Sequence, residues 1–272
     1  MADARPIGVF DSGVGGLTVV RSMLDLLPGE PIVYFGDTAR SPYGPRTLDE
    51  IRRFAREIAS FLLGRDVKML VVACNSVEVA AIEDLTAEAG VPVVGVIEPG
   101  VRAAMSATRS GRVGVIGTQA TIASGAYERA AAREGAALAA AACPAFVPFV
   151  ERGVTTGEEL HGLARGYLAP LIEARIDTLI LGCTHYPLLS GLLSMVMGPG
   201  VVLISSADET ARAVYARLVE DDILRDDPGE PVHSFLCSGE PATFRDLGTR
   251  FLGPEVTEVT ATNAQLAPLG GS

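Results

Sequence analysis

The sequence predicts an α/β fold: two similar α/β domains, with parallel-rich sheets, that face each other across a central cleft. Short apolar runs alternate with amphipathic stretches of helical length along almost the whole 272-residue chain. This alternation is typical of parallel strands joined by crossover helices. Two of the runs, Val67–Asn75 and Asp177–His185, also end alike, because each leads into a cysteine, a polar residue and a helical stretch. Their recurrence indicates two halves of similar construction.

The expected strands are short and rich in Val and Ile, residues that favour extended backbone. The Ala-rich run Ala136–Ala142 fits either a helix or a strand, and we interpret it as a strand. The other expected strands are Pro6–Phe10, Pro31–Phe35, Val67–Ala73, Pro92–Ile97, Arg112–Ile116, Asp177–Gly182, Val201–Ile204 and Val232–Leu236.

The expected helices fill the gaps between the strands and carry apolar residues at helical spacing. Their lengths are ordinary for crossover helices of a parallel sheet. They are Leu17–Leu27, Thr47–Leu63, Val77–Ala89, Pro99–Thr108, Thr121–Glu134, Thr156–Ala174, Leu188–Met197 and Asp208–Val219.

The first domain is expected to be discontinuous, with residues 1–98 joined by residues 210–259, and the second to span residues 99–209. Ligands of open α/β sheets lie outside the carboxyl ends of the strands, so the cleft between the domains is the expected site. The stretch after residue 259 carries Gly, Pro, Asn and Ser with little periodicity. We therefore expect residues 260–272 to form a disordered tail.

Composition narrows the class of protein. Hydrophobic residues make up 48% of the chain and charged residues 20%, as in a globular protein. No apolar run reaches the ~20 residues of a membrane helix and no signal peptide is evident, so we expect a soluble, cytoplasmic protein without a membrane partner. The formal net charge of −11 argues against a nucleic-acid partner. Four cysteines without a CxxC pair argue against a disulfide framework.

Cys74 and Cys183 are the strongest candidates for chemistry. Each ends an apolar strand just before a helix, where the helix N-terminus can lower the pKa of a thiol below about 8.5. A lone cysteine in such a place is most often part of the core. The recurrence of strand, cysteine, polar residue and helix in both halves favours a functional pair instead.

Polar residues at other strand ends extend the candidate site. Asp11 and Ser12 follow the strand Pro6–Phe10 and are placed to contact a ligand ammonium or a thiol. Gly13–Gly16 either cradles a phosphate or makes a tight turn with glycines at positive φ. Ser41–Gly44 is typical of a turn, and next to a cleft its backbone N–H groups could hold a carboxylate.

Glu151 and His185 are ambiguous by themselves, because a single Glu is usually solvated and a single His usually structural. His185 lies two residues from Cys183, which favours a role beside that thiol. A zinc site would need two ligands besides these two, and no second ligand pair is evident.

Five stretches of the chain, taken together, resemble glutamate racemases. The similarity runs from about Pro6 to about Val259, whereas any one stretch alone fits the wider aspartate/glutamate racemase superfamily. The resemblance implies two domains with the site between them, no pyridoxal phosphate or other cofactor, no metal, a homodimer, and conversion of L-glutamate to D-glutamate for peptidoglycan synthesis. The stretches are Gly8–Val19, Tyr34–Gly44, Val71–Asn75, Phe149–Gly153 and Leu181–Leu189.

The resemblance also implies roles for individual residues. Cys74 is similar to the base that serves the D enantiomer and Cys183 to the base that serves the L enantiomer, with the opposite thiol returning a proton. Asp11 resembles the carboxylate beside the first thiol, and Glu151 and His185 the pair that assists the second. The implied substrate contacts come from Asp11, Ser12, Tyr43, Gly44, Asn75, Ser76, Thr118, Thr184 and His185. Two groups on opposite faces are what racemisation requires, since one base would have to cross the plane of the carbanion.

The chain departs from the family pattern after Ser76, where Val77-Glu78-Val79 stands in place of small residues. Asn75 and Glu78 have the spacing of a variant capping box, which predicts a better-capped helix. Alternatively, an anion at Glu78 raises the pKa of Cys74, repels a dicarboxylate and weakens activity.

Three alternative functions stay open. The first is a racemase of another acidic amino acid such as aspartate, against which the full match of Gly8–Val19 and Leu181–Leu189 counts. The second is a binding homologue with weak or no catalysis, favoured only by Val77-Glu78-Val79. The third is a decarboxylase of the same superfamily, which would normally need one catalytic cysteine rather than two.

Overall fold

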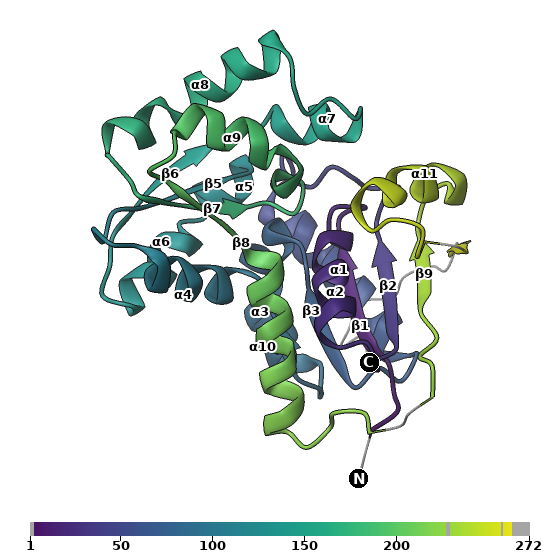
Figure 1. Ribbon diagram of the computed structural model, residues 1–272. Helices are drawn as coiled ribbons and strands as arrows, with labels where there is room; N and C mark the ends of the chain where they lie inside the picture. Colours follow the sequence, from purple (N-terminus) through teal and green to yellow (C-terminus); the bar gives the residue numbers. More distant parts are fainter. Residues whose placement is uncertain (1–2, 227–228, 257, 263–272) are drawn as a thin grey trace.

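Two parallel sheets form the framework of the molecule (Figure 1). The computed structural model describes residues 3–226, 229–256 and 258–262. One sheet has six strands in the order β10-β9-β2-β1-β3-β4, and the other has four in the order β6-β5-β7-β8. Every pairing within the two sheets is parallel. The predicted α/β fold with two parallel sheets is therefore confirmed.

Each of the nine expected strands is present, with small shifts of its ends. The expected strand Pro92–Ile97 is shortest, because Ile97 already begins a helix. The six-stranded sheet contains β1 (Ile7–Asp11), β2 (Ile32–Gly36), β3 (Met69–Val72), β4 (Val93–Val94), β9 (Ser234–Cys237) and β10 (Val259–Ala261). The four-stranded sheet contains β5 (Val113–Gly117), β6 (Leu138–Ala142), β7 (Thr178–Gly182) and β8 (Val202–Ser205).

The expected start of the disordered tail, at residue 260, is wrong. Thr260 and Ala261 belong to β10, which pairs with β9 from Val259↔Phe235 to Ala261↔Cys237. Their polar and small side chains hid a strand that is held by its backbone hydrogen bonds. The expectation for residues 263–272 concerns a part of the chain outside the described residues.

Helices connect the strands, and two were not expected from the sequence. These are α7, a short apolar stretch, and α11, which begins at Pro241. The expected helix Thr121–Glu134 is divided, because Gly125 adopts a left-handed conformation with φ of 67°. The helices are α1 (Leu17–Leu26), α2 (Leu48–Leu63), α3 (Asn75–Glu88), α4 (Ile97–Ala107), α5 (Gln119–Ala123), α6 (Ala126–Arg133), α7 (Phe146–Glu151), α8 (Glu158–Glu173), α9 (Ser190–Met197), α10 (Ser206–Glu220) and α11 (Pro241–Phe251), with a 3₁₀ turn η1 (Tyr186–Leu189).

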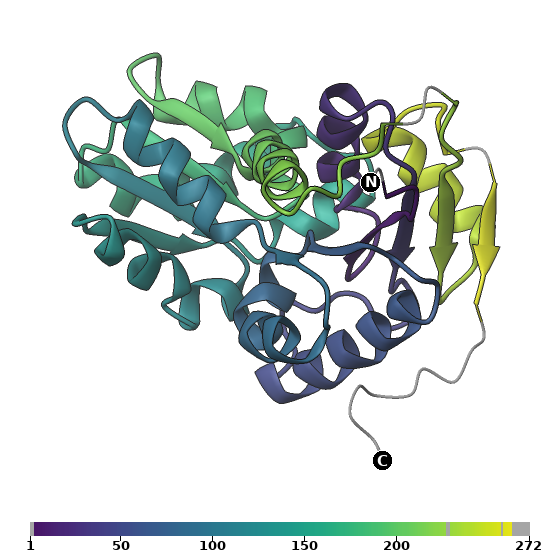
Figure 2. The same ribbon diagram turned by 90° about the horizontal axis from the view of Figure 1, so that it is seen from below.

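The chain passes between the two sheets twice. It leaves the six-stranded sheet between β4 and α4 and returns through α10, which packs against both α1 and α4. Seen from below, α10 lies end-on between the two halves (Figure 2). Residues 113–205 supply the whole four-stranded sheet, in keeping with a discontinuous first domain. The expected boundaries at 98/99 and 209/210 fall inside α4 and α10 and stay predictions.

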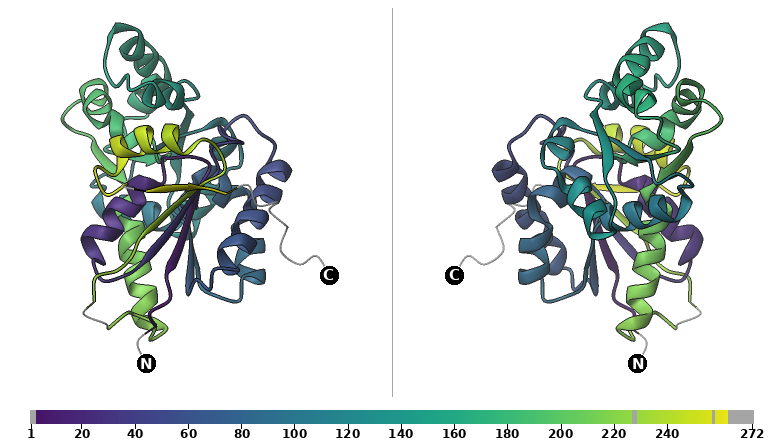
Figure 3. Two further views of the ribbon diagram at one scale, coloured as in Figure 1. Left: turned by 90° about the vertical axis from the view of Figure 1, so that its right-hand side faces the viewer. Right: turned by 90° about the vertical axis from the view of Figure 1, so that its left-hand side faces the viewer.

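The strands that lead to the candidate cysteines are central and buried. All residues of β1, β3, β5 and β7 are buried, as in parallel sheets that helices cover on both faces. At the periphery, α8 lies at one end of the molecule, and α10 reaches toward the other (Figures 1 and 3). The carboxyl ends of the central strands lie between these extremes.

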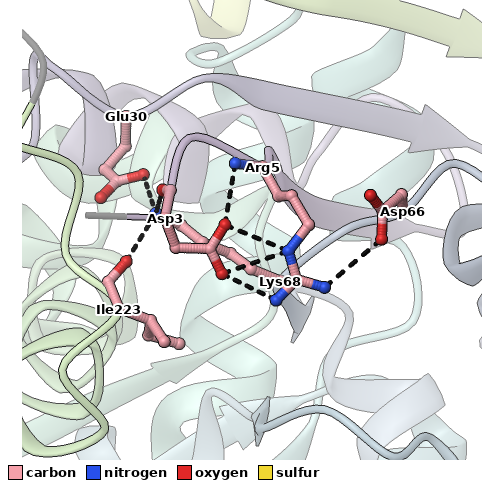
Figure 4. A network of polar contacts seen from close by, with 6 residues as sticks. All are labelled: Asp3, Arg5, Glu30, Asp66, Lys68 and Ile223. Carbon is pink, nitrogen blue, oxygen red and sulfur yellow. Dashed lines mark hydrogen bonds and ion pairs between the residues drawn. The ribbon is translucent and has the colours of Figure 1, made fainter. Parts of the chain in front are cut away.

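A buried ion pair and its hydrogen bonds join four chain segments at the amino ends of the six-stranded sheet (Figure 4). Lys68 Nζ lies 2.7 Å from Glu30 Oε2, and both side chains are at most 2% exposed. The same ammonium donates hydrogen bonds to the carbonyl oxygens of Asp3 (2.7 Å) and Ile223 (2.8 Å). A buried charge is tolerated only when it is paired and hydrogen-bonded, so these segments must meet for Lys68 to be satisfied.

We predict that Lys68→Met destabilises the fold by about 3–5 kcal/mol, because it keeps the volume but leaves the Glu30 carboxylate buried and unpaired. Urea unfolding measures the loss. The control is Arg133→Ala, which removes the exposed pair of Arg133 with Glu98 and should cost less than about 1 kcal/mol. An equal loss in the free energy of unfolding for the two variants would show that the buried ion pair stabilises the fold no more than an exposed one.

Candidate active site

A cavity of about 190 Å³ lies between the two halves, at the carboxyl ends of the central strands. Both Cys74 and Cys183 line it, although each is less than a tenth exposed. Two expected site residues, Asp11 and Glu151, do not line the cavity. Asp11 is next to the lining residue Ser12 in the chain, and Glu151 contacts the lining residue His185. The expected residues that do are Ser12, Tyr43, Gly44, Cys74, Asn75, Ser76, Thr118, Cys183, Thr184 and His185.

Cys74 is the N-cap residue of α3, as its position between strand and helix predicted. Its sulfur lies 3.6 Å from the hydroxyl oxygen of Ser12, to which the thiol donates. The expectation of a lowered pKa is wrong, however. Burial raises the pKa of Cys74, and the nearby Asp11 carboxylate raises it further, outweighing the hydrogen-bond donors around the sulfur. Cys74 is therefore a protonated thiol at neutral pH.

Asp11 ends β1 directly behind Ser12 and is 1% exposed. Its Oδ2 atom accepts a hydrogen bond from the backbone N–H of Gly13 at 3.0 Å. Its Oδ1 atom is buried and has no hydrogen-bond partner among the described residues. A buried carboxylate oxygen without a donor is costly, so this atom is suited to a cationic ligand.

Cys183 follows β7, but the helix after it does not begin where we expected. A 3₁₀ turn occupies Tyr186–Leu189, and α9 starts only at Ser190. Cys183 thus lacks the α-helix N-terminus that Cys74 has, because Pro187 and the turn intervene. Its neighbour is instead His185, whose Nδ1 atom lies 4.0 Å from the sulfur.

His185 joins Cys183 to Glu151, the arrangement that the resemblance implies. His185 Nε2 lies 3.2 Å from Glu151 Oε1, and Glu151 ends α7. Burial alone would lower the pKa of His185, but its contacts with Cys183 and Glu151 outweigh burial and raise it above the usual 6.5. A positively charged imidazole therefore lies beside the second thiol.

The segment between β6 and α7 supplies a wall that the sequence did not reveal. Pro144, Val147 and Pro148 line the cavity together with Gln119 at the start of α5. None of them carries a charge or a nucleophile, and α7 has no helical periodicity. The signal in this region was the stretch Phe149–Gly153, which pointed to Glu151 alone.

The loop Ser41–Gly44 covers the cavity and is held from behind by Asp37. This carboxylate is fully buried and accepts hydrogen bonds from the hydroxyls of Tyr43 and of Ser238, the latter at 2.6 Å. Arg40 forms an ion pair with it at 2.6 Å. The Tyr43 hydroxyl is therefore held by Asp37. That the backbone N–H groups of the loop hold a carboxylate stays a prediction.

Polar contacts cross from one half of the molecule to the other around the cavity. The hydroxyls of Ser76 and Thr118 lie 3.0 Å apart. Tyr127 donates a hydrogen bond of 2.7 Å to Asn75 Oδ1. The amide nitrogen of Asn75 is buried and unpartnered among the described residues, so it is a free donor at the cavity.

The glycines of Gly13–Gly16 serve close approach rather than backbone conformation. None of them has a positive φ, so the expected positive-φ turn is wrong. A Cβ atom at Gly15 would lie 2.3 Å from Thr184 Oγ1 and 2.5 Å from His185 Nδ1. Only glycine lets this turn of the first half lie against the polar residues that follow Cys183.

The expectation that Glu78 caps its own helix is wrong, and so is the expectation that it raises the pKa of Cys74. Its repulsion of a dicarboxylate stays a prediction. Its carboxylate does not cap its own helix, because it accepts the backbone N–H groups of Val96 and Ile97, the latter at 3.0 Å. The pKa of Cys74 is raised chiefly by burial and by Asp11 rather than by Glu78. Glu78 therefore caps the next helix, α4, a contact between residues 18 positions apart or more that local spacing could not reveal.

The described part of the chain comprises the ranges 3–226, 229–256 and 258–262. No group of three or more His, Cys, Asp or Glu side chains in these ranges is arranged to hold a metal ion. No helix there is long and apolar enough to span a membrane.

Sequence comparison identifies the family to which this arrangement belongs. The family described as Asp/Glu/Hydantoin racemase matches residues 7–214. The chain belongs to this family. The glutamate racemase of Parafrankia sp. is 58% identical over 261 residues, which cover 95% of both chains. That of Mycobacterium tuberculosis is 56% identical over 251 residues, covering 92% of this chain and 93% of the relative. The protein is accordingly an isomerase of the amino-acid racemase class.

Solved racemase structures share the fold over nearly the whole chain. A glutamate racemase isoform from Bacillus anthracis aligns with a TM-score of 0.90 at 40% identity, covering 96% of this chain and 98% of that one. The Thermus thermophilus glutamate racemase, in complex with β-chloro-D-alanine, gives 0.89 at 46% identity and covers 98% and 100%. The shared fold thus includes both parallel sheets of this chain.

We predict that Glu151→Gln lowers the pKa of His185, because the variant removes the anion that stabilises the imidazolium. Proton NMR titration measures it directly, since the chain has three histidines. His185 should titrate above pH 6.5 in the wild type and at a lower pH in the variant, while His161 serves as the internal control. An unchanged titration of His185 would contradict this account of its charge.

Burial also raises the pKa of Glu78 to about 7, from 4.5, against the hydrogen bonds that lower it. The unfolded chain therefore loses this proton at lower pH than the folded protein. The stability linked to it is present below pH 4.5 and is lost as the pH rises to about 7, roughly 3 kcal/mol in all.

We predict that Glu78→Gln makes the free energy of unfolding less dependent on pH in this window. Urea unfolding across the range from about pH 5 to about pH 8 measures it. Glu83→Gln, which removes an exposed carboxylate of the same helix, is the control. Parallel stability curves for wild type and Glu78→Gln would contradict the prediction.

Proposed function

We propose that the protein is a glutamate racemase that interconverts L-glutamate and D-glutamate by proton transfer between two cysteines, without a cofactor. One observation carries the proposal: thiols from opposite halves, Cys74 and Cys183, line a single small cavity. Racemisation needs acid–base groups on opposite faces of the α-carbon, which two facing halves are suited to provide.

The electrostatics of the two thiols support a division of labour. In the direction from L-glutamate, we assign Cys183, which lies beside the imidazolium of His185, as the base that removes the α-proton. Cys74 begins as a thiol and gives its proton to the opposite face of the carbanion. The turnover ends with Cys183 as the thiol and Cys74 as the thiolate, and D-glutamate reacts by the same steps reversed. The starting state returns when the Cys183 thiol gives a proton to solvent and the Cys74 thiolate takes one from solvent, so no proton is gained or lost over the cycle. Asp11 and His185 are the charged neighbours of these two thiols.

The carbanion needs stabilisation from fixed donors. Free or exposed donors at the cavity include the Asn75 amide and the hydroxyl of Thr184, with the backbone N–H groups of the loop Ser41–Gly44. Each such donor in a dry site contributes a few kcal/mol, about 3 in typical cases. The unpartnered Oδ1 atom of Asp11 is suited to the substrate ammonium.

Glutamate is favoured over aspartate as the substrate by the similar proteins. Relatives at 54–58% identity over most of the chain are named glutamate racemases. The Francisella tularensis glutamate racemase, 35% identical with a TM-score of 0.89, was solved in complex with D-glutamate. The aspartate racemase of Picrophilus torridus is 16% identical and shows a shared fold alone.

The lysine content of the chain supports a mechanism without pyridoxal phosphate. That cofactor is held by a Schiff base with a lysine. Lys68 is the only lysine in the sequence, and it is buried in its ion pair with Glu30 before β3. Cys74 lies beyond the other end of the same strand. A Schiff base at Lys68 would sacrifice this ion pair.

The wider role follows from the family resemblance. We propose that the enzyme acts in the cytoplasm, supplies D-glutamate for peptidoglycan synthesis and forms a homodimer. Sedimentation velocity of the full chain tests the dimer, and a single monomeric species across the concentration range would exclude it.

We predict that the cofactor-free protein exchanges the α-proton of both L-glutamate and D-glutamate in D₂O, with inversion. Cys74→Ser and Cys183→Ser should each lower racemisation by about 10³-fold or more, since each removes one acid–base group. NMR follows loss of the α-proton signal, and optical rotation follows inversion.

Cys237→Ser is the matched control, because Cys237 is buried in β9 and does not line the cavity. It should retain wild-type racemisation. A wild-type protein that leaves both glutamate enantiomers unexchanged would refute the assignment, and aspartate would then be tested in the same assay.

A further inference from the structure

Glu78 is a buried carboxylate that the proposed chemistry does not use. It lies on α3, one turn after Cys74, and is 5% exposed. Its backbone N–H donates to the carbonyl oxygen of Cys74 at 2.9 Å. Its Oε2 atom accepts the N–H groups of Val96 and Ile97. One side chain thus joins the turn that carries the first thiol to the beginning of α4.

The segment that Glu78 holds is the passage from one half of the molecule to the other. Residues 95–97 connect β4 of the six-stranded sheet to α4, and α3 and α4 lie on either side of this boundary (Figure 1). The backbone of Gly95 lies directly against the Glu78 carboxyl group, since a Cβ atom at Gly95 would lie 2.4 Å from Glu78 Cδ. The backbone of the crossover has no room to shift toward α3.

From α4 the contact continues to the second thiol. α4 packs against β7, the strand that ends just before Cys183. The approach is close at Gly100, where a Cβ atom would lie 3.7 Å from Ile180 Cγ2 and 3.2 Å from Ser206 Cβ. A chain of packed groups therefore runs from Cys74 through Glu78 and α4 to Cys183.

We propose that Glu78 is a positioning residue that sets the spacing of Cys74 and Cys183 by fixing the start of α4 against the first turn of α3. The expected effect on catalysis rests on the proposed two-thiol function, whereas the contacts of Glu78 do not depend on it. A carboxyl group suits the task, because one of its oxygens accepts two N–H groups at the N-terminus of an 11-residue helix. A shift of about 1 Å between reacting groups can cost up to 10²-fold in rate.

Two variants test this from opposite directions. Glu78→Gln keeps the shape but weakens the hold on the two N–H groups. Gly95→Ala keeps the carboxylate and forces it and the crossover apart, and it is free of backbone strain because Gly95 does not have a positive φ. The matched control is Glu83→Gln, an exposed residue of the same helix.

The first readout is thiol spacing, measured without any substrate. Dibromobimane bridges two thiols only when they are close, and peptide mapping identifies the Cys74–Cys183 product. Single alkylation by monobromobimane corrects for access. Both test variants should bridge the pair several-fold more slowly after this correction, whereas Glu83→Gln should match the wild type. Unchanged bridging in both variants would overturn the proposal, even if activity fell.

The second readout separates positioning from loss of folded protein. With glutamate in D₂O, the variants should lower kcat by about 10-fold or more with KM within about twofold. Exchange without inversion should rise relative to inversion, because the thiol that removed the proton can trade it for a solvent deuteron and return that deuteron to the same face when the opposite thiol is misplaced. A fall in total activity with an unchanged exchange-to-inversion ratio would count against the proposal.

The two readouts also separate this proposal from the assignment of the substrate. If the wild type fails to racemise glutamate while bridging still responds to Glu78→Gln and Gly95→Ala, the glutamate function fails and the positioning role stands. If Glu78→Gln does not fold, Gly95→Ala decides the question alone, since it leaves every charged group of the chain in place.

Discussion

Parallel strand direction is the constraint on which the rest of the structure depends. Because all pairings in both sheets are parallel, the central strands β1, β3, β5 and β7 end at one edge of their sheets. The two edges meet at the cavity, so residues after these strands are gathered from distant parts of the chain. Cys74 and Cys183 occupy equivalent places after β3 and β7. The site is a consequence of two parallel sheets that are brought edge to edge.

The two thiols share a topological position but not an environment. Cys74 sits at the N-terminus of α3, yet burial and Asp11 raise its pKa and keep its proton on. Cys183 has no such helix, and the charge beside it comes from His185, which Glu151 supports. A racemase needs one proton donor and one proton acceptor at the start of each turnover. In the proposed mechanism one cysteine gives a proton and the other takes one, and the two cysteines differ in the charged residues beside them.

Most of the strands, and ten of the twelve expected site residues at the cavity, could be predicted because their signals are local. A buried parallel strand is a short apolar run, and the residue after it is polar when it faces a cleft. Contacts across long separations could not be predicted in this way. Glu78 looked like a cap of its own helix because Asn75 is three residues away, but its carboxylate reaches the start of α4 instead. Likewise, β10 was missed because its backbone pairing with β9, rather than its side chains, holds it in place.

The sequence by itself determined the fold class, the two cysteines and the glycine-rich turn, because each is written in the order and periodicity of neighbouring residues. The tertiary structure alone decided what those residues do electrostatically. Whether a thiol at a helix N-terminus loses or keeps its proton depends on burial and on Asp11, 63 positions away, and these outweigh the helix. Gly15 likewise owes its identity to Thr184 and His185 rather than to its own φ. Free energies of burial and of charge depend on distances in space, which the order of residues along the chain does not contain.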